Sequence, residues 1–398
     1  MADNNENKVL NVPHLRFPEF SGEWNKYTIN DLATVVGGGT PDTTVKSYWG
    51  GDIQWFTPSE IGKNKYVDFS KRTITRDGLD NSSAKLLPLH TILLSSRATV
   101  GECSIASNEC TTNQGFQSLI AKQCNIDFLY YLIQTKKKDL IRNACGSTFL
   151  EISANEIRKI KVAVPVQNEQ EQIAKLLSLI DERIATQNKI IEDLKKLKSA
   201  IIDYAINSLD TDFAKFGSLY ETAGEGGTPT TSNASFYDNG KIPFVKIDDL
   251  KQKYLTENKD FITELGLQKS SAWLVPTRSI LFSNGATIGE ITITTYPVCT
   301  KQGILGIVPK SNIDVEFLYY FMSSTYFKKA ISRIVTEGTM KTAYLKDIAN
   351  ILCPIPTKEK QQGIAKMPSA LNSKIDYEQS LLKLFIMQKQ YLLRQMFI

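Results

Sequence analysis

The sequence contains the same series of short phrases twice, about 188 residues apart and in the same order. The matching pairs are GGGTPDTT (37–44) with EGGTPTTS (225–232), YWGGDIQWF (48–56) with FYDNGKIPFV (236–245), GLDNSSAKLLP (78–88) with GLQKSSAWLVP (266–276), ILLSSRATVGE (92–102) with ILFSNGATIGE (280–290), TNQG (112–115) with TKQG (300–303), and FLYYL (128–132) with FLYYF (317–321). Chance does not produce so long an ordered series. The chain must therefore fold as one structural unit that occurs twice.

Each copy combines short strand-like runs with a helical segment. Runs such as TILL and SIASN in the first copy, and SILF and EITITT in the second, are bounded by Gly, Pro and Ser, as strands are. The segment 128–142 reads as a helix. These patterns predict an α+β domain of about 150 residues in each half, at 1–165 and 209–356.

A long helix is predicted after each domain, at 166–208 and 357–398, because apolar residues alternate there at spacings of four and three. The first seam is Ile173, Leu177, Ile180, Ile184, Ile191, Leu194, Ile201 and Ala205, interrupted by Gln187 and Lys198. The second is Ile364, Leu371, Ile375, Leu382, Phe385, Leu392 and Met396, interrupted by Glu378 and Lys389. Pro368 would cost a hydrogen bond in a helix interior, so the second helix is expected to start or kink near it.

The polar interruptions predict how the two helices pair. A parallel, repeat-equivalent register would set Lys198 against Lys389 in an apolar seam, which is costly. An antiparallel register can instead set Lys198 against Glu378 and Gln187 against Lys389. The remaining layers would then be Ile180 with Met396, Ile184 with Leu392, Ile191 with Phe385, Leu194 with Leu382, Ile201 with Ile375 and Ala205 with Leu371.

Composition sets limits on the class of protein. At 398 residues, with 42% hydrophobic and 22% charged residues, the chain is long enough for two or three domains, each with a core. No apolar run reaches the roughly 18 residues of a membrane-spanning helix, so we expect a cytoplasmic protein without a membrane partner. The six cysteines form no C-x-x-C pair and there are two histidines, which argues for buried thiols and against a metal site. The net charge of +5 does not by itself indicate nucleic-acid binding.

Motifs for catalysis are missing from the sequence. Neither GGGTP nor GEGGTP is followed by the lysine of a phosphate-binding loop, and there is no G-x-S-x-G. No N-P-P-Y-type motif or glycine-rich adenosyl-methionine loop is found, and two histidines leave little room for general-base chemistry. We therefore expect no catalytic residues in this chain.

The layout of domain, helix, domain, helix resembles the specificity subunit of Type I restriction-modification enzymes over essentially the whole chain. The phrases LRFPEFSGEW, GGTP in each domain, ATVGE and ATIGE, and the helix opening Pro165, Glu169, Gln170 carry the likeness. The second copy departs from that opening, with Pro356, Lys360 and Gln361, so only the glutamine is shared.

The resemblance implies a non-catalytic subunit in which each domain recognises one half of a split target in double-stranded DNA. The helices would pair antiparallel and dock methyltransferase subunits, two in number, with restriction subunits in the full complex. Adenosyl-methionine, ATP and magnesium would belong to those partner subunits. A helix of about 40 residues is about 60 Å long, which exceeds the 34 to 36 Å of one duplex turn. Two copies that differ in sequence imply an asymmetric target with an unread gap.

Candidate DNA contacts are polar residues at, or next to, matched positions where the polarity differs between the copies. Arginine and lysine suit guanine edges, and asparagine and glutamine suit adenine. The base-reading candidates are Arg97, Asn113 and Gln114 in the first copy and Asn284, Lys301 and Gln302 in the second. Candidate phosphate contacts are Lys63, Lys65, Lys71 and Arg72, with Lys246, Lys251, Lys253 and Lys259.

Alternatives remain open at this stage. Surface drift explains any single polar difference as well as base contact does, and the lysines could form a solvated face. Tyr130, Tyr131, Tyr319 and Tyr320 are expected in the core rather than as stacking platforms. A coiled-coil scaffold that binds only proteins, or an unrecognised DNA-modifying enzyme, are the alternative functions.

Overall fold

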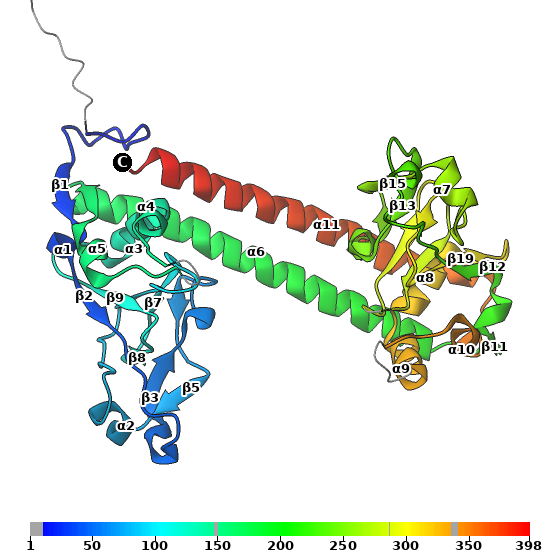
Figure 1. Cartoon of the computed structure of the whole chain (residues 1–398), viewed down its shortest axis with the longest axis horizontal. Coiled ribbons are helices and arrows are strands. Elements are labelled where there is room, and N and C mark those ends of the chain that lie inside the picture. Colours follow the sequence, from blue (N-terminus) through cyan, green and yellow to red (C-terminus); the bar gives the residue numbers. More distant parts are fainter. Residues whose placement is uncertain (1–10, 147–149, 286, 336–340) are drawn as a thin grey trace, which may run out of the picture. The chain divides into compact units, whose positions relative to one another are not determined.

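The computed structural model describes residues 11–146, 150–285, 287–335 and 341–398. Ala286, which opens the second ATIGE phrase, lies outside the described residues. The chain groups into two compact units, one formed by Met1–Asn188 with Ser380–Ile398 and the other by Lys189–Gln379. Each unit holds one α+β domain and part of both long helices (Figure 1).

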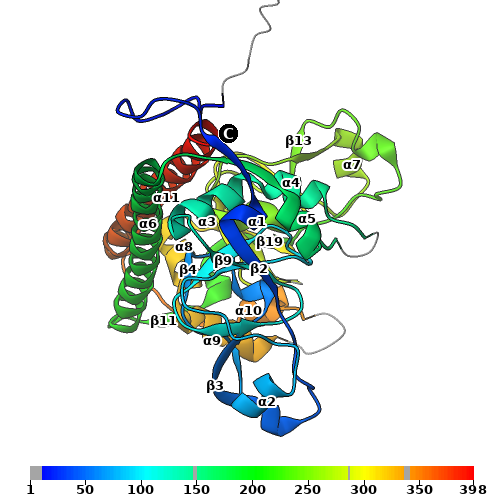
Figure 2. The same ribbon diagram turned by 90° about the vertical axis from the view of Figure 1, so that its left-hand side faces the viewer.

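The first domain is built around three small sheets. Its central five-stranded sheet has the order β2 (Ala33–Gly37), β9 (Gln117–Ala121), β6 (Ile92–Leu94), β7 (Cys103–Ala106) and β4 (Tyr66–Val67). A three-stranded sheet follows the order β5 (Arg72–Ile74), β3 (Trp49–Phe56) and β8 (Cys110–Thr112), and β1 (Asn25–Thr28) pairs with β10 (Lys161–Val164). The helices are α1 (Ile29–Leu32), α2 (Arg76–Asp80), α3 (Ile126–Thr135), α4 (Lys137–Arg142) and α5 (Ala154–Lys159). Figures 1 and 2 both place β3 and α2 at the end of this domain away from α6.

The second domain repeats this topology strand for strand. Its five-stranded sheet runs β12 (Tyr220–Glu225), β19 (Ile304–Pro309), β16 (Ile280–Ser283), β17 (Ile291–Thr294) and β14 (Tyr254–Leu255). The smaller sheets are β15 (Asp260–Ile262), β13 (Ile242–Val245) and β18 (Cys299–Thr300), and β11 (Phe213–Lys215) with β20 (Leu352–Pro354). The helices are α7 (Glu264–Gln268), α8 (Val315–Ser323), α9 (Thr325–Ile334) and α10 (Leu345–Ile348). The predicted α+β duplication is confirmed, with one difference: the segment 128–142 is two helices that meet at Lys136.

The repeated GGTP phrase is a site of close backbone packing. A Cβ atom on Gly39 would lie 2.3 Å from the backbone nitrogen of Ala84, and one on Gly227 would lie 2.3 Å from that of Ala272. Both partner residues belong to the repeated SSA phrase. Two phrases that are distant in sequence therefore recur together because their backbones touch.

The long helices are α6 (Gln167–Asn207) and α11 (Lys358–Gln395). The expected start near Pro368 is wrong, because α11 begins ten residues earlier and continues through the proline. Contacts on both sides of Pro368 hold the helix to the second domain: Gln361 accepts a hydrogen bond from the Asp314 backbone, and Ser369 donates one to Glu316. This packing offsets the hydrogen bond that proline removes.

In each unit the two helices run antiparallel, as predicted. In the first unit Ile173 and Leu177 of α6 share a core with Leu392 and Met396 of α11. In the second unit Ile202, near the C-terminal end of α6, shares a core with Ala365, near the N-terminal end of α11. Every predicted seam position is buried or half-buried.

The predicted pairing register is wrong by six residues: a residue of α6 meets a residue of α11 that lies six positions before the predicted partner. Lys389 forms an ion pair with Asp181 at 2.7 Å instead of meeting Gln187, and Lys198 donates to Asn372 at 2.9 Å instead of meeting Glu378. The Glu378 carboxylate pairs with Lys374 on its own helix. The prediction assumed that a polar seam residue must face another. The long lysine side chains reach instead to acceptors that flank the seam.

We predict that Gly39→Ala destabilises the first domain by about 1 to 3 kcal/mol, because its methyl group would overlap the backbone of residues 83–84. The matched control is Gly363→Ala on α11, where a Cβ has no neighbour within 4 Å and helix propensity favours alanine by up to about 1 kcal/mol. Urea unfolding of both full-length variants measures the difference. Equal stability of Gly39→Ala and the native chain would contradict the close-packing explanation.

Candidate nucleic-acid interface

The base-reading candidates of the first domain lie in loops that follow strands. Arg97, shortly after β6, is 42% exposed and forms an ion pair with Glu151 at 2.8 Å. Asn113 follows β8 and is half-buried, with its Oδ1 accepting a hydrogen bond from the Gly115 backbone at 2.9 Å. Gln114 is exposed and accepts a hydrogen bond from Thr40 of the GGTP phrase.

The second domain presents an equivalent loop but not every candidate. Lys301 and Gln302 are exposed after β18, and the Gln302 backbone donates to Thr228 of the second GGTP phrase at 3.3 Å. Asn284 is only 1% exposed, and its Nδ2 donates to the Ala343 carbonyl oxygen at 3.2 Å. The proposed base contact through Asn284 is therefore wrong, because its side chain fills the domain interior.

Several phosphate candidates lie on the surface. Lys63, Lys71 and Lys259 are exposed. Lys246 pairs with Asp260 at 2.7 Å, and Lys251 pairs with Asp248 at 3.2 Å, and both lysine side chains are exposed. Arg72 is exposed and stacks on Trp49.

Two of the phosphate candidates are internal instead. Lys65, just before β4, pairs with Asp127 of α3 at 2.8 Å and donates to Ser178 of α6 at 2.6 Å. Its ammonium group lies 5.0 Å from the ring centre of Tyr131, which is fully buried. Lys65 therefore holds the first domain on the long helix through these contacts.

The second copy builds the same arrangement from equivalent residues. Lys253, just before β14, pairs with Glu316 of α8 at 2.8 Å and donates to Ser369 of α11 at 2.9 Å. The buried Tyr320 donates to Ser369 at 3.1 Å. We call this repeated group the docking cluster: Lys65, Asp127, Ser178 and Tyr131 in the first copy, and Lys253, Glu316, Ser369 and Tyr320 in the second. The expectation that these tyrosines are core residues is confirmed.

Hydrogen bonds stabilise the negative charge of the Glu316 carboxylate in the second docking cluster. Burial raises the pKa of Glu316, but hydrogen bonds from Lys253 and Ser369 outweigh that effect and bring it to about 2. The lysine side chain is at most 9% exposed in both copies, while its carboxylate partner keeps 27 to 29% exposure.

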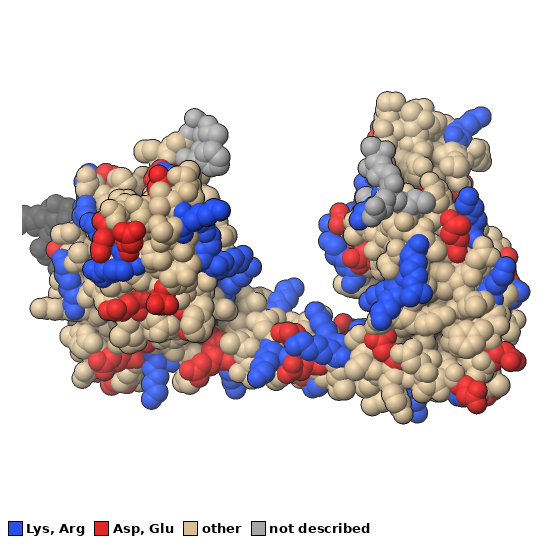
Figure 3. All heavy atoms as spheres, turned by 90° about the horizontal axis from the view of Figure 1, so that it is seen from below, with Lys and Arg blue, Asp and Glu red and all other residues tan. Residues whose placement is uncertain are grey.

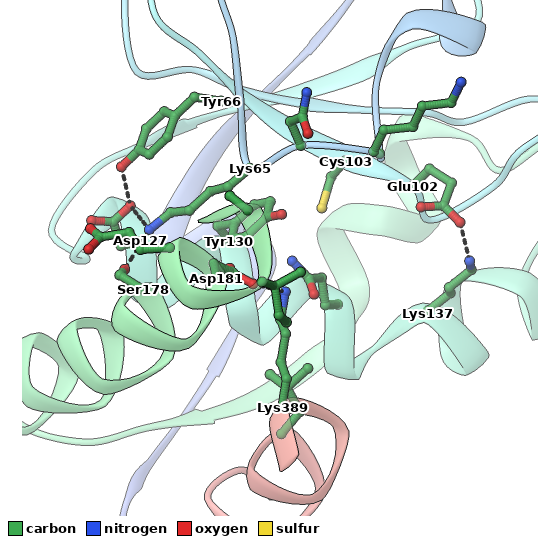
Figure 4. Close-up of a pocket in the computed structure, with 18 of the residues that line it drawn as sticks. Lys65, Tyr66, Glu102, Cys103, Asp127, Tyr130, Lys137, Ser178, Asp181 and Lys389 are labelled. Atoms are coloured by element: carbon green, nitrogen blue, oxygen red, sulfur yellow. Dashed lines mark hydrogen bonds and ion pairs between the residues drawn. The ribbon is translucent and has the colours of Figure 1, made fainter. Parts of the chain in front are cut away.

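A polar pocket of about 730 Å³ lies beside the docking cluster of the first unit. Lys389 of α11 reaches toward Asp181 of α6 there, and Lys137 pairs with Glu102 at the other side (Figure 4). Lysines and carboxylates share the wall. The pocket is part of the joint between domain and helices.

The glutamine shared by both helix openings has a structural role that sequence reasoning did not find. Gln170 accepts a hydrogen bond from the backbone of Asn125, the N-cap residue of α3, at 3.0 Å. Gln361 does the same for Asp314, the N-cap residue of α8, at 2.8 Å. Each long helix is thus tied to the start of its domain's core helix.

The position before this glutamine differs between the copies, with Glu169 in the first and Lys360 in the second, and this difference has a structural cause. Glu169 is fully buried and pairs with Arg16 at 2.7 Å, and Trp24 donates to it. Both partners belong to LRFPEFSGEW, a phrase that occurs in the first copy only. Lys360, the counterpart of Glu169, therefore has no equivalent of this phrase to pair with.

Cysteine burial follows the expectation in part. Cys103, Cys110, Cys299 and Cys353 are buried free thiols, and burial raises the pKa of Cys103 to about 12. Cys145 is exposed, against expectation.

On the face drawn in Figure 3, Lys and Arg are interspersed with Asp and Glu over both domains and the helices. Within the described ranges, no cluster of three His, Cys, Asp or Glu residues could hold a metal ion. None of the described helices is both long and apolar enough to cross a membrane.

We predict that acid weakens the second docking cluster through Glu316. Its pKa of about 2 in the folded chain lies below the ordinary value of 4.5, so the carboxylate contributes stability above about pH 4.5 that is lost as the pH falls toward 2. Hydrogen exchange of peptides from residues 209–356 should show a stability difference between the native chain and Glu316→Gln that shrinks from pH 6 to about pH 3.

The control for this experiment is Asp248→Asn, which changes a carboxylate that is 91% exposed. Its stability difference should stay constant over the same pH range. A difference for Glu316→Gln that does not change with pH would contradict the assignment.

Comparisons with known proteins agree with this architecture. The family model described as "Type I restriction modification DNA specificity domain" matches residues 21–196 and 210–384. The MjaIX specificity subunit of a Type I restriction enzyme from Methanocaldococcus jannaschii is 30% identical over 383 residues, which cover 89% of this chain and 88% of that protein. The EcoR124I/EcoR124II specificity subunit of Escherichia coli is 28% identical over 190 residues, or 46% of each chain.

The solved structures show the same fold. A Type I system S subunit from M. genitalium covers 97% of this chain and 99% of its own, with a TM-score of 0.57 at 18% identity. A structure from work on assembly of the type I R-M system has a TM-score of 0.62 at 14% identity, and covers 96% of this chain and 98% of its own. With both copies matched by the family model, this chain belongs to the family of Type I restriction-modification DNA specificity subunits.

Proposed function

We propose that this chain recognises an asymmetric, two-part sequence in double-stranded DNA and directs methyltransferase and restriction subunits to it. Each domain would read one half-site, and two methyltransferase subunits would dock on the long helices. The site of action would be the cytoplasm. The family membership and the two domains of identical topology support this proposal.

One observation carries the proposal: equivalent surface loops on identical frames present different chemistry. The loop after β8 offers Asn113, and the loop after β18 offers Lys301 at the same position. Gln114 and Gln302 are exposed in both loops and are held against the GGTP phrase. Two domains that recognise different base sequences require this combination of a shared backbone frame and different polar residues in equivalent loops.

We propose further that catalysis belongs to partner subunits. Adenosyl-methionine, ATP and magnesium would then bind those subunits and not this chain. The lack of a phosphate-binding loop, an N-P-P-Y-type motif and a glycine-rich adenosyl-methionine loop in the sequence supports this view.

Replacing residues 213–350 with the equivalent segment of a relative should change one half of the methylated motif and leave the other half unchanged. The segment carries the second domain except β20, and so includes all of its loops between strands, while the first domain keeps its own loops. Strand-specific methylation mapping of a genome that carries the hybrid with its partner subunits measures this. A motif altered in both halves would contradict independent reading.

The isolated chain should bind duplex DNA without turning over any substrate. Incubation with DNA, adenosyl-methionine and ATP tests for methyl transfer, strand cleavage and ATP hydrolysis. Turnover that a point mutation in this chain abolishes would contradict the proposed division of labour. Absence of DNA binding by the chain together with its partner would favour a protein-only scaffold.

A further inference from the structure

Arg72 differs from the other basic candidates in its contacts. Its guanidinium carbon lies 3.6 Å from the ring centre of Trp49 and 5.5 Å from that of Trp55. Arg97, by contrast, is held by Glu151. Within the described ranges Arg72 forms no ion pair and no side-chain hydrogen bond, so its N–H donors remain available on the surface.

The aromatic support of Arg72 is itself fixed. The two tryptophan rings lie perpendicular with centres 5.0 Å apart. Trp55 is 4% exposed and its Nε1 donates to the Gly39 carbonyl oxygen at 2.9 Å, while the Nε1 of Trp49 donates to the Asp42 carbonyl oxygen at 3.1 Å. A planar guanidinium stacked on such a ring is already oriented, so less side-chain entropy is lost when it binds a ligand.

The equivalent position in the second copy carries the opposite charge. Arg72 lies across the strand pair from Trp55, and Asp260 lies across the corresponding pair from Phe244. Asp260 binds Lys246 at 2.7 Å. The phosphate backbone is the same along every duplex, so a phosphate contact has no reason to change sign between two copies of one frame. A base contact has such a reason, because the two half-sites differ.

We propose that Arg72 reads a guanine in the half-site bound by the first domain. The guanidinium fork would donate two hydrogen bonds, to O6 and N7 of the base in the major groove, with the tryptophan pair setting its plane. This inference rests on the proposed function and assigns one base class within it. Arg72, first considered as a phosphate contact, becomes a specificity-determining residue.

The test uses the full chain assembled with its methyltransferase partner and strand-specific methylation mapping. Arg72→Ala and Arg72→Gln should both lose the preference for guanine at one position of one half-site, by about ten- to a hundredfold, because neither side chain suits a guanine edge. The other half-site should not change. The control is Arg142→Ala on α4, an arginine of the same domain that is 77% exposed and paired with Asp139, and its motif should equal that of the native chain.

The variants separate base reading from phosphate contact. If Arg72→Ala or Arg72→Gln weakens binding equally on all sequences and keeps the motif, Arg72 is a phosphate contact and the proposal is wrong. If Arg72→Ala fails to fold, Arg72→Gln, which retains a long side chain over Trp49, decides the question by the same readout. Absence of sequence-specific methylation by the native complex would refute the proposed function itself, and is distinct from a motif that Arg72 variants leave unchanged.

Discussion

The ion pair between a buried lysine and a carboxylate at the start of a core helix fixes each domain of this chain on its long helix. In the first unit Lys65 pairs with Asp127 and also donates a hydrogen bond to Ser178 of α6. In the second unit Lys253 pairs with Glu316 and also donates a hydrogen bond to Ser369 of α11. Buried ion pairs give modest net stability because desolvation offsets attraction, but they tolerate little change in geometry. Because the ion pairs recur at equivalent positions, both domains contact their long helix in the same way. The polar residues of the loops after β8 and β18 can then differ without changing that contact.

Much of the architecture could be predicted from repetition and periodicity. The duplicated phrases gave two domains of one topology, and the spacing of apolar residues placed both long helices and their buried faces. The pairing register could not be predicted in the same way. Seam periodicity tells which side of a helix is buried, whereas Lys198 and Lys389 choose acceptors beside the seam, Asn372 and Asp181. A flexible lysine reaches several registers, so its position alone does not select one.

The candidate site was predicted less well, for a related reason. Sequence shows that a residue is polar but not which way it points: Lys65, Lys253 and Asn284 read as surface groups and are internal. The exposed loop residues Gln114, Lys301 and Gln302 were placed correctly on the surface by their position between strand-like runs. The roles of Gln170 and Gln361 had a signal, since a glutamine was the one residue both helix openings retained. Only the fold shows that each meets the N-cap residue of a helix about 45 residues earlier.

One difference between the joints has a consequence for how the chain responds to its solution. In the first unit Lys389 meets the carboxylate of Asp181, while at the equivalent place in the second unit Lys198 meets the neutral amide of Asn372. Dissolved salt screens attraction between net charges more strongly than a short hydrogen bond to an amide dipole. Rising ionic strength therefore loosens the contact between α6 and α11 in the first unit more than in the second. The contact between the two helices thus depends more on ionic strength in the first unit than in the second, because Asp181 is a carboxylate and Asn372 is a neutral amide.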